Sequence, residues 1–258
     1  MPSTAGSPVA VYCGSSIGKR PAYAKAAISV GTALAKNNRP LVYGGLSEAP
    51  AGTYGLMGVV SHTVLQAGGR VTGVIPYAIL MTGGEADKSS ELDASYTKRP
   101  VEAEPSTSGA SESNDKCQTI VVNSMHERKV EMAKRSCGFI GLPGGFGTFD
   151  EVFEVTTWTQ LGIHDKPVVL VNVLNYYDPL RKMIQNALND GFIQPYNVRL
   201  VTFVDGPEDL DEHESYDWGT AALRAIDDWK KGKANAVYDW TKQNQLDGTQ
   251  AEGNLAVT

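Results

Sequence analysis

The chain has 258 residues, of which 41% are hydrophobic and 20% charged, so it is long enough to bury the core of one large α/β domain. Its formal net charge of −6 offers no basic surface, and nucleic acid is therefore not an expected partner. The three cysteines are odd in number and lack metal-ligand spacing, which argues against both a disulfide framework and a metal site: Cys13, Cys117 and Cys137.

The beginning of the chain and its apolar runs bear on location. Residues 1–8 lack the charged start and the apolar run of a secretory leader, and no stretch approaches the ~20 apolar residues of a membrane span. We therefore expect a soluble, cytoplasmic protein that contacts no membrane.

Short apolar runs alternate with helical patterns in the first half of the chain. Strands are predicted over residues 9–12, 40–43 and 71–75, and helices over 21–37 and 55–68. Small residues follow the first two strands, namely Cys13-Gly-Ser-Ser16 and Gly44-Gly45, and residues 46–51 resemble a small insertion.

These small-residue turns can present backbone N–H and hydroxyl donors to a nucleotide, chiefly from Ser15, Gly44 and Gly45. The first turn is not the dinucleotide-binding fingerprint, because Gly14-Ser-Ser-Ile-Gly18 lacks the required order of glycines. The turn therefore resembles a first nucleotide-binding loop of another kind.

The composition changes at Gly83. Residues 86–115 contain nine Ser or Thr and seven Asp or Glu against three Lys or Arg, so this segment cannot bury a core. We predict an insertion loop over about residues 83–116, with no function assigned, and a polar, flexible tail over 230–258. Residues 1–229 then form a single nucleotide-binding catalytic domain.

The second half continues the alternation of strands and helices. Strands are predicted at 117–122, 137–142, 166–172 and 199–204. Helices are predicted at 125–135, from after Thr148 to Gly162, at 177–190 and at 217–229. Such alternation predicts a doubly wound, Rossmann-like parallel sheet in the α/β class, with its site at the carboxyl ends of the strands.

The stretch from Leu142 to Glu151 is the strongest candidate site. Gly144, Gly145 and Gly147 let backbone N–H groups turn inward and a ligand approach closely, and Thr148 can cap the following helix. The helix N-terminus can hold a phosphate, and Glu151 then lies beside the rest of the ligand. Each feature alone is ordinary in α/β proteins, but the whole string favours a site.

A basic pair, Arg128 and Lys129, begins the helix that leads into this strand and turn. Such a pair usually belongs to a solvated helix face. Its position, however, predicts that the helix start lies near the same pocket.

Two motifs, Pro143-Gly-Gly-Phe-Gly-Thr-Phe-Asp-Glu151 and Met125-His-Glu-Arg-Lys129, resemble those of the LOG ("lonely guy") family of cytokinin riboside 5′-monophosphate phosphoribohydrolases. The resemblance covers residues 9–205 without the insertion. It implies hydrolysis of the N-glycosidic bond of an N6-substituted AMP, giving the free base and ribose 5-phosphate. Members often carry an older label of lysine decarboxylase, but no lysine here stands in a recognisable cofactor-linking context.

The resemblance also implies roles for individual residues. Glu151 matches the family's catalytic acid and Arg128 its catalytic arginine. The remaining substrate-binding candidates are Gly144, Gly145, Gly147, Thr148, Ser15, Gly44, Gly45, Met125 and Lys129. No metal or cofactor is required, and a homodimer or larger assembly is implied.

Departures from the family's pattern leave alternatives open. Three departures suggest a fungal or microbial member: the insertion at 46–51, the longer segment before the Met-His motif, and Ser124 in place of Asp. Plain AMP could be the main substrate, or the chain could be a nucleotide-binding carrier. The presence of both Arg128 and Glu151 argues against a carrier, because binding alone requires no acid.

Overall fold

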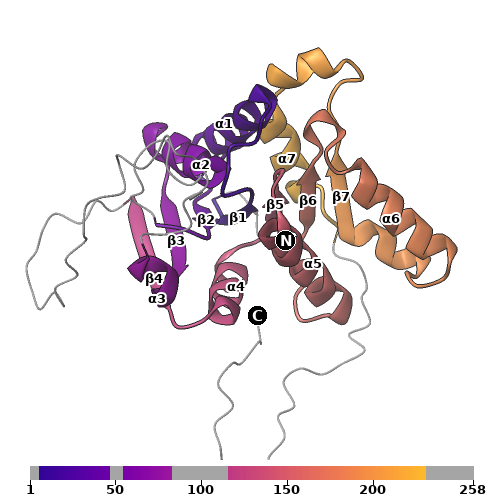
Figure 1. The fold of residues 1–258 in the computed structure, drawn as a ribbon, viewed down its shortest axis with the longest axis horizontal. Helices are drawn as coiled ribbons and strands as arrows, with labels where there is room; N and C mark the ends of the chain where they lie inside the picture. Colours follow the sequence, from indigo (N-terminus) through magenta and orange to yellow (C-terminus); the bar gives the residue numbers. More distant parts are fainter. Residues whose placement is uncertain (1–5, 47–54, 83–115, 231–258) are drawn as a thin grey trace, which may run out of the picture.

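A seven-stranded sheet forms the centre of the computed structural model, which describes residues 6–46, 55–82 and 116–230 (Figure 1). All its strand pairs are parallel, in the order β4-β3-β2-β1-β5-β6-β7. Their bounds are β1 (Val9–Tyr12), β2 (Leu41–Tyr43), β3 (Val71–Pro76), β4 (Cys117–Val122), β5 (Phe139–Gly141), β6 (Val168–Val171) and β7 (Val201–Val204). The predicted doubly wound α/β fold is confirmed.

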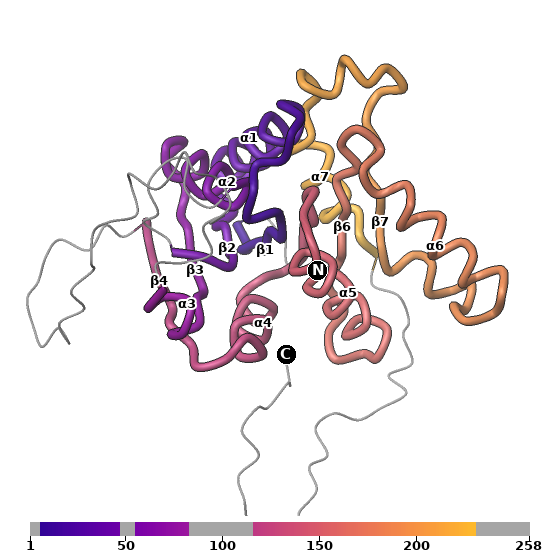
Figure 2. Tube along the Cα trace, viewed as in Figure 1, coloured from indigo at the N-terminus to yellow at the C-terminus, as the bar shows by residue number. Residues whose placement is uncertain are grey.

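Helices cover both faces of the sheet. On one face lie α1 (Pro21–Lys36), α2 (Gly55–Gln66) and α7 (Trp218–Asp227), and on the other α4 (Met125–Arg135) and α5 (Phe146–Leu161) (Figures 1 and 2). Strand β1 serves both layers, because alternate side chains of a strand point to opposite faces. Val9 and Val11 enter the core under α1, while Ala10 and Tyr12 enter the core under α4 and α5.

The strand order reverses between β1 and β5. The chain passes outward from β1 to β4 and then returns to place β5 beside β1, where Leu142 N donates to Tyr12 O at 2.9 Å. The loops after these two strands therefore diverge from one point at the carboxyl edge of the sheet, which is where doubly wound sheets bind ligands.

The predicted strands and long helices are confirmed, with bounds that differ by at most three residues. Short elements were missed: α3 (Tyr77–Met81) and the 3-10 turns η1 (Val173–Asn175), η2 (Pro195–Leu200) and η3 (Leu210–Glu214). Helix α6 (Asp178–Asn189) completes the set. The small insertion beyond residue 46, nearly all of the 83–116 insertion and the tail after 230 lie outside the described residues. Among those described, no helix has the length and apolarity needed to cross a bilayer.

Candidate active site

Three segments meet at the reversal point. Gly14 N donates to Pro143 O at 3.1 Å, and Met57 N donates to Gly14 O at 3.4 Å, so the turn after β1 contacts both the glycine turn after β5 and the start of α2. Gly55, the first residue of α2, has φ +59°, and a Cβ there would fall 2.3 Å from the carbonyl carbon of Ser15. A glycine is therefore required where α2 meets the first turn. Ser15 thus lies against the start of α2, next to Gly14, which contacts the glycine turn.

The glycines of the turn after β5 divide into two kinds. A Cβ on Gly144 would lie 2.1 Å from Oγ1 of Thr148 and 2.8 Å from N of Gly14, so this glycine allows the protein to pack on itself. A Cβ on Gly145 or Gly147 would meet nothing within 4 Å. The open space for a ligand therefore lies beside Gly145 and Gly147.

The expectation that Thr148 caps α5 is wrong. The helix starts at Phe146, its N-cap is Gly145, and no side chain caps it. Thr148 lies inside the first turn and is buried, since its side chain packs against Gly144. First-turn N–H groups have no partner within a helix, so this N-terminus is suited to an anion.

Arg128 and Glu151 form a buried ion pair beside this turn. Nη2 of Arg128 lies 3.3 Å from Oε1 of Glu151, and the two residues are only 4% and 8% exposed. The pair joins α4 to α5 over the carboxyl end of β1. Removing one partner of such a pair leaves a buried charge, so each residue fixes the other.

Gly44 lies directly against the Arg128 guanidinium. A Cβ at this position would fall 2.0 Å from Nη2 and 2.5 Å from Cζ of Arg128. The space beside Gly44 is thus filled by the catalytic candidate itself, and the prediction that Gly44 lines the nucleotide concerns only its backbone atoms. Gly45 instead faces the ring of Tyr43.

Two buried groups near Glu151, Tyr12 and Cys13, are uncharged. Burial, with Glu151 and then Glu154 nearby, raises the pKa of Tyr12 well above its ordinary value. Burial and Glu151 likewise raise the pKa of the Cys13 thiol. Both groups therefore stay protonated at neutral pH, and neither adds a negative charge to the site.

A variant of the capping box starts α4, in which Glu127 bonds to Asn123, the residue before the N-cap Ser124. Ser124 accepts from Glu127 N at 3.1 Å, and Glu127 accepts from Asn123 N at 2.7 Å. Lys129 then reaches α5, 3.2 Å from Asp150 and 3.0 Å from Glu154. Desolvation alone would lower the pKa of Lys129, but its bonds to the two carboxylates outweigh this and raise it.

Met125 lies at the exposed start of α4, with its Sδ 4.0 Å from Nη1 of Arg128. The structure thus brings both members of the predicted basic pair to α5, with Met125 beside Arg128. Among the described residues, no group of three His, Cys, Asp or Glu side chains is arranged to hold a metal ion.

Sequence reasoning missed two tyrosines that hold the glycine turn. The Tyr177 hydroxyl donates to Leu142 O at 2.6 Å, and the Tyr176 hydroxyl donates to Gly144 O. Both follow η1 at the carboxyl end of β6. Their position after a parallel strand could have indicated a role at the site, because ligands bind at the carboxyl edge of such a sheet.

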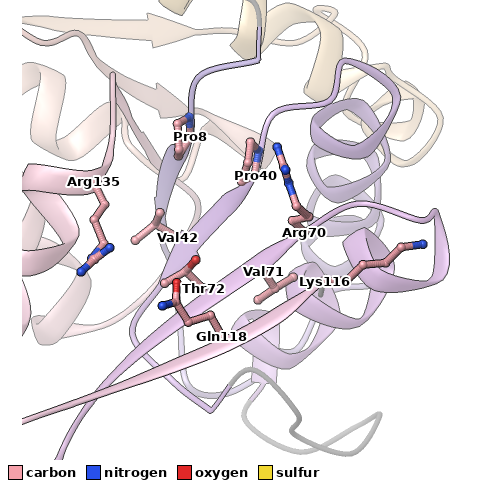
Figure 3. Close-up of a pocket in the computed structure, with 9 residues that line it drawn as sticks. All are labelled: Pro8, Pro40, Val42, Arg70, Val71, Thr72, Lys116, Gln118 and Arg135. Carbon is pink, nitrogen blue, oxygen red and sulfur yellow. The ribbon is translucent and has the colours of Figure 1, made fainter. Parts of the chain in front are cut away.

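A cavity of about 450 Å³ lies at the opposite edge of the sheet, among the amino ends of β1 to β4 (Figure 3). Its lining includes Arg70, Lys116 and Arg135, whose side chains point in different directions and do not converge on one ligand position. Arg135 is also paired with Glu131 at 3.1 Å. The catalytic candidates lie at the carboxyl edge, and none of them lines this cavity.

Comparison with known proteins identifies relatives over most of the chain. A family model described as "Possible lysine decarboxylase" matches residues 57–213. A probable cytokinin riboside 5′-monophosphate phosphoribohydrolase of Oryza sativa subsp. japonica is 41% identical over 204 residues, covering 79% of this chain and 70% of that one. A cytokinin riboside 5′-monophosphate phosphoribohydrolase of Arabidopsis thaliana is 42% identical over 187 residues, covering 72% of each. Among solved structures, a Moco carrier protein from Chlamydomonas reinhardtii aligns with TM-score 0.49 at 18% identity, covering 85% of this chain and 97% of that one.

Proposed function

The chain belongs to the family of cytokinin riboside 5′-monophosphate phosphoribohydrolases, and from that premise we propose that it cleaves N6-substituted adenosine 5′-monophosphates into free base and ribose 5-phosphate. The observation that supports this most is the buried Arg128–Glu151 pair, 3.3 Å apart, beside a glycine turn at a helix N-terminus. Phosphate binding and a fixed carboxylate are the two requirements of this reaction.

The chemistry follows from the charge that develops on the sugar. As the C1′–N9 bond breaks, C1′ and the ring oxygen acquire positive charge, which an adjacent carboxylate stabilises. We assign this role to Glu151, which also orients the attacking water and takes its proton. Water oxygen bonds to C1′ and the departing base gains a proton, so the products are base and ribose 5-phosphate.

The other residues bind and orient the nucleotide. The 5′-phosphate occupies the open space at Gly145 and Gly147, at the N-terminus of α5. Arg128 keeps Glu151 in place and can bind sugar hydroxyls, because its planar guanidinium offers several fixed donors. Ser15, Gly44, Gly45, Met125 and Lys129 line the rest of the subsite, with Gly144 and Thr148 shaping the turn.

Amino-acid decarboxylation, which the description of the family model suggests, fits the site poorly. A lysine that forms a Schiff base needs a lowered pKa. Lys129, the lysine at the site, has a raised pKa because two carboxylates bind it. Lys166 has a pKa lowered to about 8 by burial, but its Nζ donates to Ala133 O, near the far end of α4.

The test is to incubate the purified protein with N6-isopentenyladenosine 5′-monophosphate and with AMP, and to separate the products by chromatography. We expect release of the free base and ribose 5-phosphate, faster from the N6-substituted nucleotide. Faster turnover of AMP would make the protein an AMP nucleosidase. Tight binding without cleavage would make it a carrier and refute the proposal.

We further propose that the protein is a cytoplasmic homodimer. Helix α6 has no buried residue, and the following segment exposes Phe192 (85%) and Tyr196 (69%), an apolar surface that a second copy can cover. The three cysteines are thiols that form no disulfide, as expected in a reducing compartment. Residues 1–229 stay our predicted catalytic domain, with the tail outside it.

A further inference from the structure

Tyr176 contacts the glycine turn, and the proposed mechanism gives it no role. Its hydroxyl donates to the carbonyl oxygen of Gly144, and its ring packs edge to face on Tyr23 and Tyr177. Burial raises its pKa, and although the bond to Gly144 opposes this, the net shift is upward, so the hydroxyl stays protonated and remains a donor.

The bonded carbonyl belongs to the same peptide unit as the N–H of Gly145. Because a trans peptide is planar, its C=O and N–H point in opposite directions. Fixing the Gly144 carbonyl toward Tyr176 therefore fixes the Gly145 N–H toward the other side, at the N-cap of α5. Within the described residues no acceptor binds this N–H, and the space beside Gly145 is open.

The backbone around Tyr176 is itself held firmly. Leu174 and Asn175 have φ of +51° and +58°, which side-chain-bearing residues rarely adopt. Leu174 N donates to Nδ1 of the buried His213 at 2.9 Å, and Tyr177 N donates to the Asn172 side chain at 2.7 Å. Residues in such conformations persist only where their surroundings hold them, and they cluster at functional sites.

We propose that Tyr176 is a positioning residue of the phosphate subsite: by holding the Gly144 carbonyl it directs the Gly145 N–H at the 5′-phosphate of the nucleotide. This inference rests on the proposed function, because it takes the anion at α5 to be the nucleotide's phosphate. Tyr177 provides the contrast. It holds the carbonyl of Leu142, whose peptide nitrogen belongs to Pro143 and carries no N–H.

The test compares Tyr176→Phe with Tyr177→Phe as the matched control, since each change removes one hydroxyl bonded to one carbonyl of the same turn. Binding of AMP and of adenosine is measured by titration calorimetry, and folding by thermal unfolding. We expect Tyr176→Phe to weaken AMP binding about 10-fold, the effect of one charge-assisted hydrogen bond, and to change adenosine binding less than twofold. Tyr177→Phe lowers the melting temperature but leaves the ratio of the two affinities within twofold of wild type.

Several results would overturn the inference: AMP binding unchanged in Tyr176→Phe, an equal loss in both variants, or an equal loss for AMP and adenosine. Kinetics give a second measure, since weaker phosphate binding should raise KM more than it lowers kcat. The calorimetric test needs no turnover. A wild type that binds AMP but never cleaves it would refute the proposed function and leave the role of Tyr176 still testable.

Discussion

Substituting Gly44 by alanine should inactivate the site through Arg128. The added Cβ would lie 2.0 Å from Nη2, 2.5 Å from Cζ and 2.6 Å from Nε of the guanidinium, whereas an ordinary contact is at least 3.4 Å. The guanidinium must therefore retreat by roughly 1.4 Å, the difference between 3.4 and 2.0 Å, which disturbs its 3.3 Å contact with Glu151. A misplacement of about 1 Å can cost about 10²-fold in rate, and we expect a loss of that size in kcat/KM.

The assay is a double-mutant cycle of Gly44→Ala and Arg128→Ala, following base release from the N6-substituted nucleotide. Gly44 does not have a left-handed φ, so alanine itself is tolerated by the backbone. In the wild-type background the loss is about 10²-fold. In the Arg128→Ala background the guanidinium is absent and the further loss should be less than threefold. The coupling free energy is then about 2–2.7 kcal/mol, the equivalent of roughly 30- to 100-fold.

Two results would refute this reasoning. Near-normal activity of Gly44→Ala would show that the guanidinium relocates without consequence. An equal loss in both backgrounds would show that Gly44 acts independently of Arg128, for example by contacting the nucleotide through its backbone. Thermal unfolding of each variant distinguishes either result from simple misfolding.

Three further predictions concern stability and assembly. Burial, and then Lys166, lowers the pKa of His164 to about 3, so this side chain takes up a proton below pH 6.5 in the unfolded chain but not in the folded one. The free energy of unfolding should therefore fall by about 2 kcal/mol between pH 6.5 and 5. His164→Gln should reduce this pH dependence in denaturant titrations. Gly219→Ala should lower the free energy of unfolding by about 1–3 kcal/mol, because the added Cβ would lie 2.2 Å from Ser29 O where α7 packs on α1. An unchanged denaturation midpoint would contradict this close packing. The pair Phe192→Glu and Tyr196→Glu should convert a dimer to a monomer in light scattering, and a wild type that is already monomeric would exclude the proposed assembly.

Much of the fold was readable from the sequence because local signals agreed with one another. The run at β6 is apolar on both faces, as a buried parallel strand must be, and glycine or proline marks the ends of several other elements. The α3 helix was missed because five residues are too few for a helical period to show.

The residues of the candidate site could be predicted from the sequence, but the contacts that each of them makes could not. Gly144 and Gly145 are adjacent and identical in sequence, yet one packs against Thr148 and the other faces open space. That difference depends on where α5 begins. The sequence did not reveal this start, and for the same reason Thr148 was wrongly predicted as the cap of the helix. The contact of Gly44 with Arg128 joins β2 to α4, and such long-range packing leaves no local signal.

The most direct test of the account compares release of free base and ribose 5-phosphate by wild type, Glu151→Gln and Asp150→Asn. Asp150 is the neighbouring carboxylate on α5, but its side chain is 59% exposed and binds Lys129. If the buried carboxylate stabilises the charged sugar, Glu151→Gln loses at least about 10²-fold in kcat, while Asp150→Asn stays within about threefold of wild type. Cleavage by Glu151→Gln at the wild-type rate would contradict the assignment of Glu151 as the catalytic residue.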